Sequence, residues 1–314
     1  MNIRVSALTQ TNNAIANIRA RSADLAKYQE QISSGVRIAR ASDDPGSYPA
    51  LAQARAAAKR LDSYTQTVGD ATSVLNSSVN ALQDVNDVLV RARQIAIEAG
   101  NATTEGEPTS REALATELDG LIGRALTAAN SQPDGKTLFA GTAFATAPFR
   151  VATTDAAGRP ATVVYDGSTD RTRTITGRGT TVDTRYVGSD VFQQPGADTF
   201  ASLIALRDTL RGTIPPGSSY SQQITLRIGE VDAARTAIGE ATGEQASNLA
   251  TLDALQKLIG DARVDTAARA SDLESTDYAE AVVKLKEQET ALQAIYAVTA
   301  KQAQTNTGLL SFIG

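Results

Sequence analysis

The sequence holds few side chains that could carry out catalysis. Among its 314 residues there is no His and no Cys, so the commonest general base, the thiol nucleophile and the commonest ligands of transition metals are missing. A Ser–His–Asp triad cannot be built from this composition, and disulfides, zinc–thiolate sites and iron–sulfur clusters are excluded. A catalytic or metal site would therefore have to do without imidazole and thiol groups.

Three groups of residues match such chemistry in part. Asp84 with Asp87, and Glu287 with Glu289, could each supply an acid–base pair, but carboxylates scattered along helical patterns are typical of a solvated face. Residues 134–137 read Asp-Gly-Lys-Thr, a fragment of a phosphate-binding loop that lacks the earlier glycine and does not follow a predicted strand. We therefore expect no enzymatic activity and no cofactor.

Residues 33–45, which read SSGVRIARASDDP, predict a structured link between two helices. Gly35 suits a helix C-cap with positive φ, and Asp44 followed by Pro45 suits an N-cap and a first helical position. The adjacent Asp43 and Asp44 could instead bind a metal ion, but two neighbouring carboxylates without a third ligand do not make a calcium loop. Capping is therefore the favoured role, and no metal is expected.

The two ends of the chain carry weak heptad patterns. Between residues 4 and 33, alternating steps of three and four form a seam that is polar at Ser22 and Gln29. Such a segment is expected to be marginal alone and helical when packed against a partner. Near residues 271–277 several N-cap residues, Asp277 among them, predict the start of a last helix. The apolar positions are Leu8, Ile15, Ile18, Leu25 and Ile32 at one end, and Leu285, Leu292, Ile295, Val298, Leu309, Leu310 and Phe312 at the other.

Longer helices are predicted between these ends. The heptad step holds for more than five heptads over residues 61–99, a helix of roughly 60 Å. A shorter helix follows from Pro108 to about residue 129, and a second long seam runs from Ile224 to Ile259 through Gln245 and Gln256. Such helices can pack side by side as a bundle. The first long seam comprises Leu61, Tyr64, Val68, Ala71, Leu75, Ser78, Leu82, Val85, Leu89, Ala92, Ala96 and Ala99.

The middle of the chain has a different composition. From residue 137 to 193 it is rich in Thr, Val, Tyr, Phe and Gly. Alternation over 162–165, 172–176 and 181–187 predicts short strands, and Asp166–Gly167 is a hairpin-turn signal. The expected fold class is mainly α: a long coiled-coil-like helical bundle formed by the N- and C-terminal segments, with a small inserted β domain in the middle.

Charge and hydropathy limit the partners. The net charge of −5 argues against nucleic acid, and no segment approaches the roughly 20 apolar residues of a membrane helix. The first 20 residues lack the apolar run of a Sec signal peptide. The terminal seams also lack the Lys- and Arg-rich polar face of a membrane-surface helix. We therefore expect partner helices rather than a membrane.

Both ends of the chain resemble the bacterial flagellin family. Residues 32–45 are similar to its N-terminal signature, in which Ser-Gly-x-Arg-Ile leads to Asp-Asp. Residues 277–289, DYAEAVVKLKEQE, resemble the start of its last helix, and residues 309–313, LLSFI, its apolar tail. Within the family, residues 137–149 and the Pro that follows Asp-Asp are similar to members that join the hook to the filament.

The resemblance implies a structural role in the extracellular flagellum. Subunits would be exported through the flagellar type III apparatus without a cleaved signal peptide and would self-assemble as a ring or helix. They would contact a neighbouring hook-associated protein and flagellin, and an export chaperone would hold the last helix. The apolar terminal positions named above would carry subunit contacts. The connection between inner tube and outer body would lie at Ser34, Gly35, Arg37, Asp43, Asp44 and Pro45.

The same resemblance divides the chain into five segments. These are the N-terminal inner-tube helix (1–40), two halves of a helical rod (41–136 and 201–270), the β insert (137–200) and the C-terminal inner-tube helix (271–314).

Three other functions stay open. The chain could be a filament flagellin that polymerises into the propeller. It could be a signalling coiled coil, although the missing membrane span and the β insert argue against that. It could also bind a surface polysaccharide through Tyr165, Asp166, Tyr186 and Phe192 in the insert.

Overall fold

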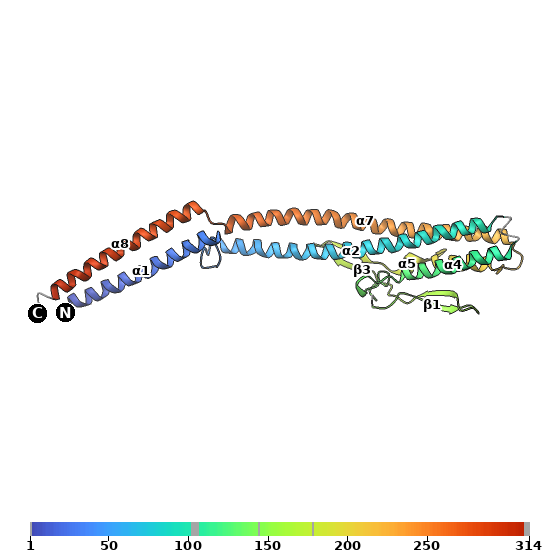
Figure 1. Ribbon diagram of the computed structural model, residues 1–314, viewed down its shortest axis with the longest axis horizontal. Helices are drawn as coiled ribbons and strands as arrows, with labels where there is room; N and C mark the ends of the chain where they lie inside the picture. Colours follow the sequence, from blue (N-terminus) through green and yellow to red (C-terminus); the bar gives the residue numbers. More distant parts are fainter. Residues whose placement is uncertain (1, 102–106, 144, 178, 311–314) are drawn as a thin grey trace. The chain divides into compact units, whose positions relative to one another are not determined.

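The computed structural model describes residues 2–101, 107–143, 145–177 and 179–310 (Figure 1). Side chains are described for residue 9 and for residues 12–301 within these ranges. The chain divides into two compact units. Unit 1 comprises residues 1–61 and 262–314, and unit 2 comprises residues 62–261. The predicted fold class, a helical protein with a small β insert, is confirmed.

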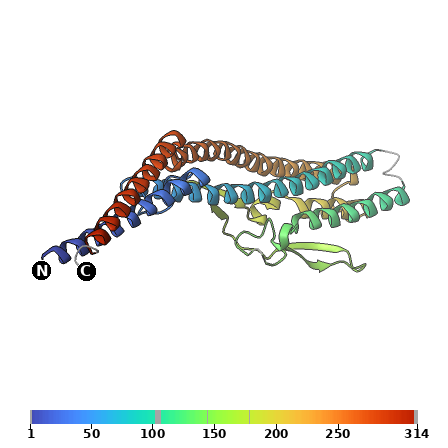
Figure 2. The same ribbon diagram turned by 60° about the vertical axis from the view of Figure 1, so that its left-hand side comes forward.

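Unit 1 is built on the two terminal helices. Helices α1 (Asn2–Ser34) and α8 (Tyr278–Leu310) lie side by side and run antiparallel, as both views show (Figures 1 and 2). The first residues of α2 (Tyr48–Ala99) and the last residues of α7 (Tyr220–Glu274) complete the unit. Ile38 and Leu51 are fully buried, so an apolar core forms where the terminal helices meet the long ones.

Unit 2 contains most of the long helices α2 and α7. Along α2, every predicted seam position from Val68 to Ala99 is buried, which confirms the heptad reading there. Leu61 and Tyr64, at the start of the seam, are half-buried. Helix α4 (Pro108–Ala129) lies beside α2, where Arg91 pairs with Glu117 at 2.6 Å.

The predicted seam along α7 needs one correction. Gln256 is exposed, whereas Leu255 is half-buried. Leu252 and Ile259, on either side of Gln256 in the seam, are buried, so the buried face continues past this turn with the apolar Leu255 in place of the polar glutamine.

Among the described residues, three two-stranded antiparallel sheets form the β region. Strand β1 (Phe149–Thr154) pairs with β2 (Pro160–Tyr165), β3 (Thr172–Ile175) with β4 (Thr181–Arg185), and β5 (Gln193–Gln194) with β6 (Ala197–Asp198). The short helices η1 (Pro133–Gly135) and α5 (Gly188–Phe192) lie before and after the two longer hairpins. Helix α6 (Thr199–Leu210) then leads toward α7, and its apolar residues Leu203, Ile204, Leu206 and Leu210 are buried.

The hairpin predicted at Asp166–Gly167 is wrong. β2 pairs upstream with β1 through a turn in which Asp155 Oδ1 accepts hydrogen bonds from the backbone N–H groups of Ala157 and Arg159, both at 2.9 Å. These bonds lower the pKa of Asp155 to about 2, with the Arg159 backbone the largest cause. The partner of β2 is thus β1, a strand in which apolar and polar residues do not alternate over the full length.

An aromatic cluster forms the core of the β region. The rings of Phe139, Phe149, Phe192 and Phe200 contact one another with centroid distances from 4.9 to 6.2 Å. Phe192 and Tyr186 are buried, and burial raises the pKa of Tyr186 to about 12. The proposed sugar-binding set is therefore wrong as an open groove, because two of its aromatic side chains lie in the core. Asp166 instead pairs with Arg150 at 2.6 Å.

Candidate functional site: the terminal helix pair and its joint

The terminal helix pair buries only part of its predicted apolar seam. Leu292 is buried, whereas Ile15 is 42% exposed and Val298 is 59% exposed. A pair of helices can bury one stripe on each member, so the other apolar positions face away from the pair. The half-buried positions are Ile18, Leu25, Ile32, Leu285 and Ile295. The side chains of Leu8, Leu309 and Leu310, and the whole of Phe312, lie outside the described residues.

A second apolar surface on α8 extends beyond the positions expected to carry subunit contacts. Val282 and Val283 are 45% and 56% exposed, and Tyr278 and Tyr296 are 56% and 54% exposed. The two valines line a shallow groove of about 630 Å³ with Lys286, Glu287, Thr290, Ala291 and Ala294. Burying a Val side chain stabilises by about 1.5–3 kcal/mol, so α8 presents apolar area that a further helix would cover favourably.

The joint between α1 and α2 is tied to the α7–α8 connection. Gly35 has a φ of 72° and ends α1 as predicted, with its N–H donating to the Gln31 carbonyl at 2.9 Å. Its own carbonyl accepts from Thr276 N–H at 2.9 Å, and Arg37 N–H donates to Glu274 O at 2.7 Å. A short antiparallel bridge therefore joins two segments that are more than 230 residues apart in the sequence.

Arg37 holds both sides of this joint. Its Nη2 donates to the Leu273 carbonyl at 2.7 Å, and its Nη1 donates to Asp44 Oδ2 at 2.9 Å. Asp44 also accepts from the backbone N–H groups of Gly46 and Ser47. The hydrogen bonds from Ser47, and to a smaller extent the one from Arg37, hold the pKa of Asp44 well below its usual range.

The capping interpretation of the paired aspartates is confirmed. Asp43 Oδ2 accepts from the N–H groups of Ala39 and Arg40 at 3.1 and 2.7 Å, so each carboxylate closes a turn of the link. Pro45 is not the first helical residue, because α2 begins at Tyr48 and Pro45 lies in the turn before it. The hydrogen bonds that Asp44 accepts close this turn, and the helix begins directly after it.

The remaining connection residues also lie at the joint. Ser34 Oγ donates to the Glu30 carbonyl at 2.7 Å and accepts from Val36 N–H. Asp277 caps α8 as predicted, through its bonds from Ala279 and Glu280 N–H. Arg37, Asp43, Asp44 and Pro45 line a cavity of about 330 Å³ with residues of α1 and α8. All six predicted connection residues are thus brought together in unit 1.

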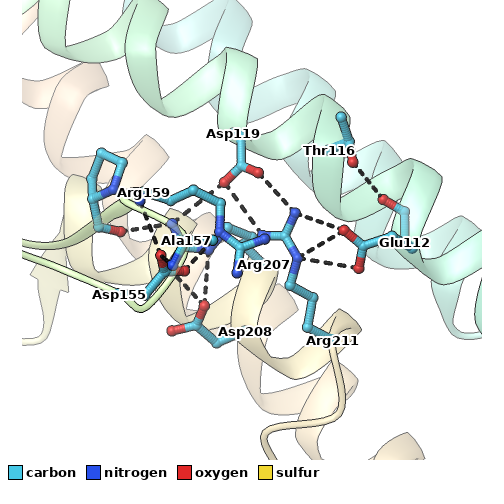
Figure 3. Close-up of polar contacts among 10 residues, drawn as sticks. Glu112, Thr116, Asp119, Asp155, Ala157, Arg159, Arg207, Asp208 and Arg211 are labelled. Carbon is cyan, nitrogen blue, oxygen red and sulfur yellow. Dashed lines mark hydrogen bonds and ion pairs between the residues drawn. The ribbon is translucent and has the colours of Figure 1, made fainter.

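An ion network around the buried Arg207 of unit 2 was not predicted from the sequence (Figure 3). Arg207 is 1% exposed, donates to the Pro160 carbonyl at 2.6 Å and contacts Asp119 and Asp208. Arg211 pairs with Asp119 at 2.8 Å and with Glu112 at 2.9 Å, and these carboxylates raise its pKa. The network fastens α6 to α4 and to the β1–β2 hairpin. The one sequence signal for this network is the pair of Arg residues at positions 207 and 211, one helical turn apart.

The described part of the chain contains neither a cluster of metal ligands nor a membrane-spanning helix. No three acidic side chains there gather closely enough to hold a metal ion. No helix among the described residues has the length and apolarity needed to cross a bilayer.

The N-terminal part of the chain is similar to proteins of the flagellin class. Residues 5–143 match the family model of the bacterial flagellin N-terminal helical region. The solved structure of a putative flagellar hook-associated protein from Vibrio parahaemolyticus has the same fold, with a TM-score of 0.65 and 19% identity, over 74% of this chain and 100% of that one.

Within that class the chain is similar to flagellar hook-associated protein 3. The Salmonella typhimurium protein of that name is 25% identical over 309 residues, which cover 94% of this chain and 95% of the relative. A flagellar filament core protein of Brachyspira hyodysenteriae is 24% identical over 307 residues, 96% of each chain. These matches confirm the resemblance to the flagellin family, and to hook-associated protein 3 within it.

Proposed function

We propose that this chain is a structural component of the bacterial flagellum that joins the hook to the filament, as a hook-associated protein 3. Its relatives carry names of structural flagellar proteins. The proposed mechanism is self-assembly through the terminal helices, without catalysis.

One observation carries the proposal: a single subunit leaves apolar side chains of α1 and α8 uncovered. Ile15, Val283 and Val298 are between 42% and 59% exposed on helices that already pack against each other. Because burying apolar area is the main favourable term in association, further subunits would pack on these faces. Leu8, Ile18, Leu25, Ile32, Leu285, Leu292, Ile295, Leu309, Leu310 and Phe312 belong to the same proposed contact set.

The proposal includes partners and place. A neighbouring hook-associated protein and flagellin would meet the assembled subunits outside the cell, and an export chaperone would hold α8 before assembly. The joint at Ser34 to Pro45 would connect an inner-tube part, residues 1–40 and 271–314, to a rod formed by 41–136 and 201–270. The insert at 137–200 would face outward or toward a neighbour.

A filament flagellin is the second candidate function. The filament core protein of Brachyspira hyodysenteriae matches this chain over nearly its whole length. A flagellin and a junction protein would share the terminal-helix contacts, so those contacts do not distinguish them. The ability to extend a filament distinguishes a flagellin from a junction protein.

Seeded polymerisation tests the proposal. Purified full-length chain is mixed with short filament fragments and followed by light scattering and electron micrographs. A junction protein should cap or decorate the ends without extending them. Long filaments made of this chain alone would establish the flagellin alternative instead.

A matched pair of variants tests the role of the helix faces. Val298→Asp places a charge on an exposed apolar position of α8 and should abolish end binding, because burying an unpaired carboxylate is costly. Gln293→Asp adds the same charge at an exposed polar position of the same helix and should bind more strongly than Val298→Asp. Equal binding by both variants would contradict the proposed surface.

A further inference from the structure

We propose that Ser78 of α2 and Gln245 of α7 form an internal site that binds a water molecule between the two helices of unit 2. Ser78 is 1% exposed and Gln245 is 0% exposed. Within the described residues, neither the Ser78 Oγ nor the Gln245 Oε1 and Nε2 atoms have a hydrogen-bond partner. Three buried polar atoms thus remain to be satisfied on neighbouring helices.

Two contacts fix the register of α2 and α7 in unit 2. Arg93 Nε donates to Asp232 Oδ1 at 2.8 Å. Further along, a Cβ placed on Gly100 would lie 3.5 Å from Cγ2 of Ile224. Residue numbers rise along one helix as they fall along the other, so the two helices are antiparallel.

This register brings the two polar side chains to the same level. Ser78 precedes Arg93 by 15 residues, and Gln245 follows Asp232 by 13 residues. At about 1.5 Å per residue these steps are about 22 Å and about 20 Å, in the same direction along the pair. Both side chains are buried, so both face the interior of the unit at that level.

The levels on either side of this site are apolar. Leu75 and Leu82 flank Ser78 on α2, and Ile238 and Leu252 flank Gln245 on α7 at one heptad's distance; all four are buried. A single polar layer in an apolar seam is costly unless its groups are hydrogen-bonded. The Ser hydroxyl can donate and accept, and the Gln amide can donate twice and accept.

Water is the ligand that this set of atoms fits. A buried water molecule typically makes about three hydrogen bonds to otherwise unsatisfied polar groups, and this layer supplies that number from two helices. The amide and hydroxyl carry no net charge, so an ion is not favoured there. The site would join α2 to α7 through a shared molecule rather than through direct packing.

A double-mutant cycle on the full-length chain tests the coupling. Ser78→Ala and Gln245→Met each remove part of the site while keeping a side chain of similar or smaller size. The unfolding equilibrium constant is measured in denaturant for both single variants and the double variant. Residues that share a partner are coupled by about 0.5–3 kcal/mol, so the effect of Gln245→Met should differ by about twofold or more between the two backgrounds.

The same substitution at an exposed position is the control. Gln256→Met lies on α7 at an exposed site and should combine additively with Ser78→Ala. Additivity of Gln245→Met with Ser78→Ala as well would overturn the proposal, since the two side chains would then share nothing.

A second measurement separates bound water from a direct bond and needs no variant. Magnetisation transfer from water to the ¹⁵N-labelled side-chain amide of Gln245 should show a long-lived water next to it. Coupling in the cycle without that signal would mean that the hydroxyl and the amide bond each other directly. That outcome would also overturn the water site.

Discussion

Replacing Gly35 with alanine should destabilise the joint between α1 and α2 by about 1–2 kcal/mol, the cost of placing a Cβ in the left-handed region. Gly35 has a φ of 72°, and a Cβ there would lie 2.9 Å from the Tyr278 hydroxyl oxygen. That hydroxyl is the far end of a flexible, exposed side chain and can shift, so the backbone term dominates. The bonds from Thr276 and Arg37 pin the segment and prevent it from relaxing to another conformation.

Denaturant unfolding of the full chain, followed by circular dichroism, measures this change. Gly69→Ala is the matched control, because Gly69 lies within α2 and a Cβ there would meet nothing within 4 Å. Alanine is favoured over glycine in a helix interior by up to about 1 kcal/mol, so this variant should be stabilised. Gly35→Asn should lose less than Gly35→Ala, since Asn tolerates the left-handed region. If Gly35→Ala were as stable as Gly69→Ala, the positive φ would not constrain the joint.

Three further predictions follow from the structure. Arg207→Leu should destabilise unit 2 by about 1–3 kcal/mol, because it removes the buried donor to the Pro160 carbonyl and a cation that pairs with the half-buried Asp119 and Asp208. Arg150→Ala at an exposed pair should change stability by about 0.5 kcal/mol or less. Comparable denaturation midpoints for the two variants would refute this. Asp44 has a folded-state pKa below its unfolded value, so its ionised carboxylate stabilises the folded state above about pH 4, and this contribution is lost as pH falls further. The difference in free energy of unfolding between wild type and Asp44→Asn should therefore shrink with acidification. A difference that grows would contradict this prediction. In dilute monomer, limited proteolysis should cut α1 and α8 before unit 2, because the terminal pair buries less apolar area; terminal helices that outlast unit 2 would count against their role as assembly elements.

The sequence predicts local structure correctly where one residue or a short repeat determines it. The seam from Val68 to Ala99 is buried throughout, because a 3.5-residue repeat places its members on one helical face. Gly35 and Asp277 ended and began their helices as predicted, because capping depends on a few adjacent atoms.

Contacts between distant segments were decided by the tertiary structure. β1 pairs with β2 although the alternation of β1 does not continue past its first residues, since cross-strand bonds connect backbones and do not require a side-chain pattern. Arg207 meets Asp119 across 88 residues, and no local rule names that partner. The joint shows both contributions. Its caps follow from Gly35, Asp43 and Asp44, but its bridge from Arg37 to Leu273 and Glu274 exists only because the folded helices bring the two connections together.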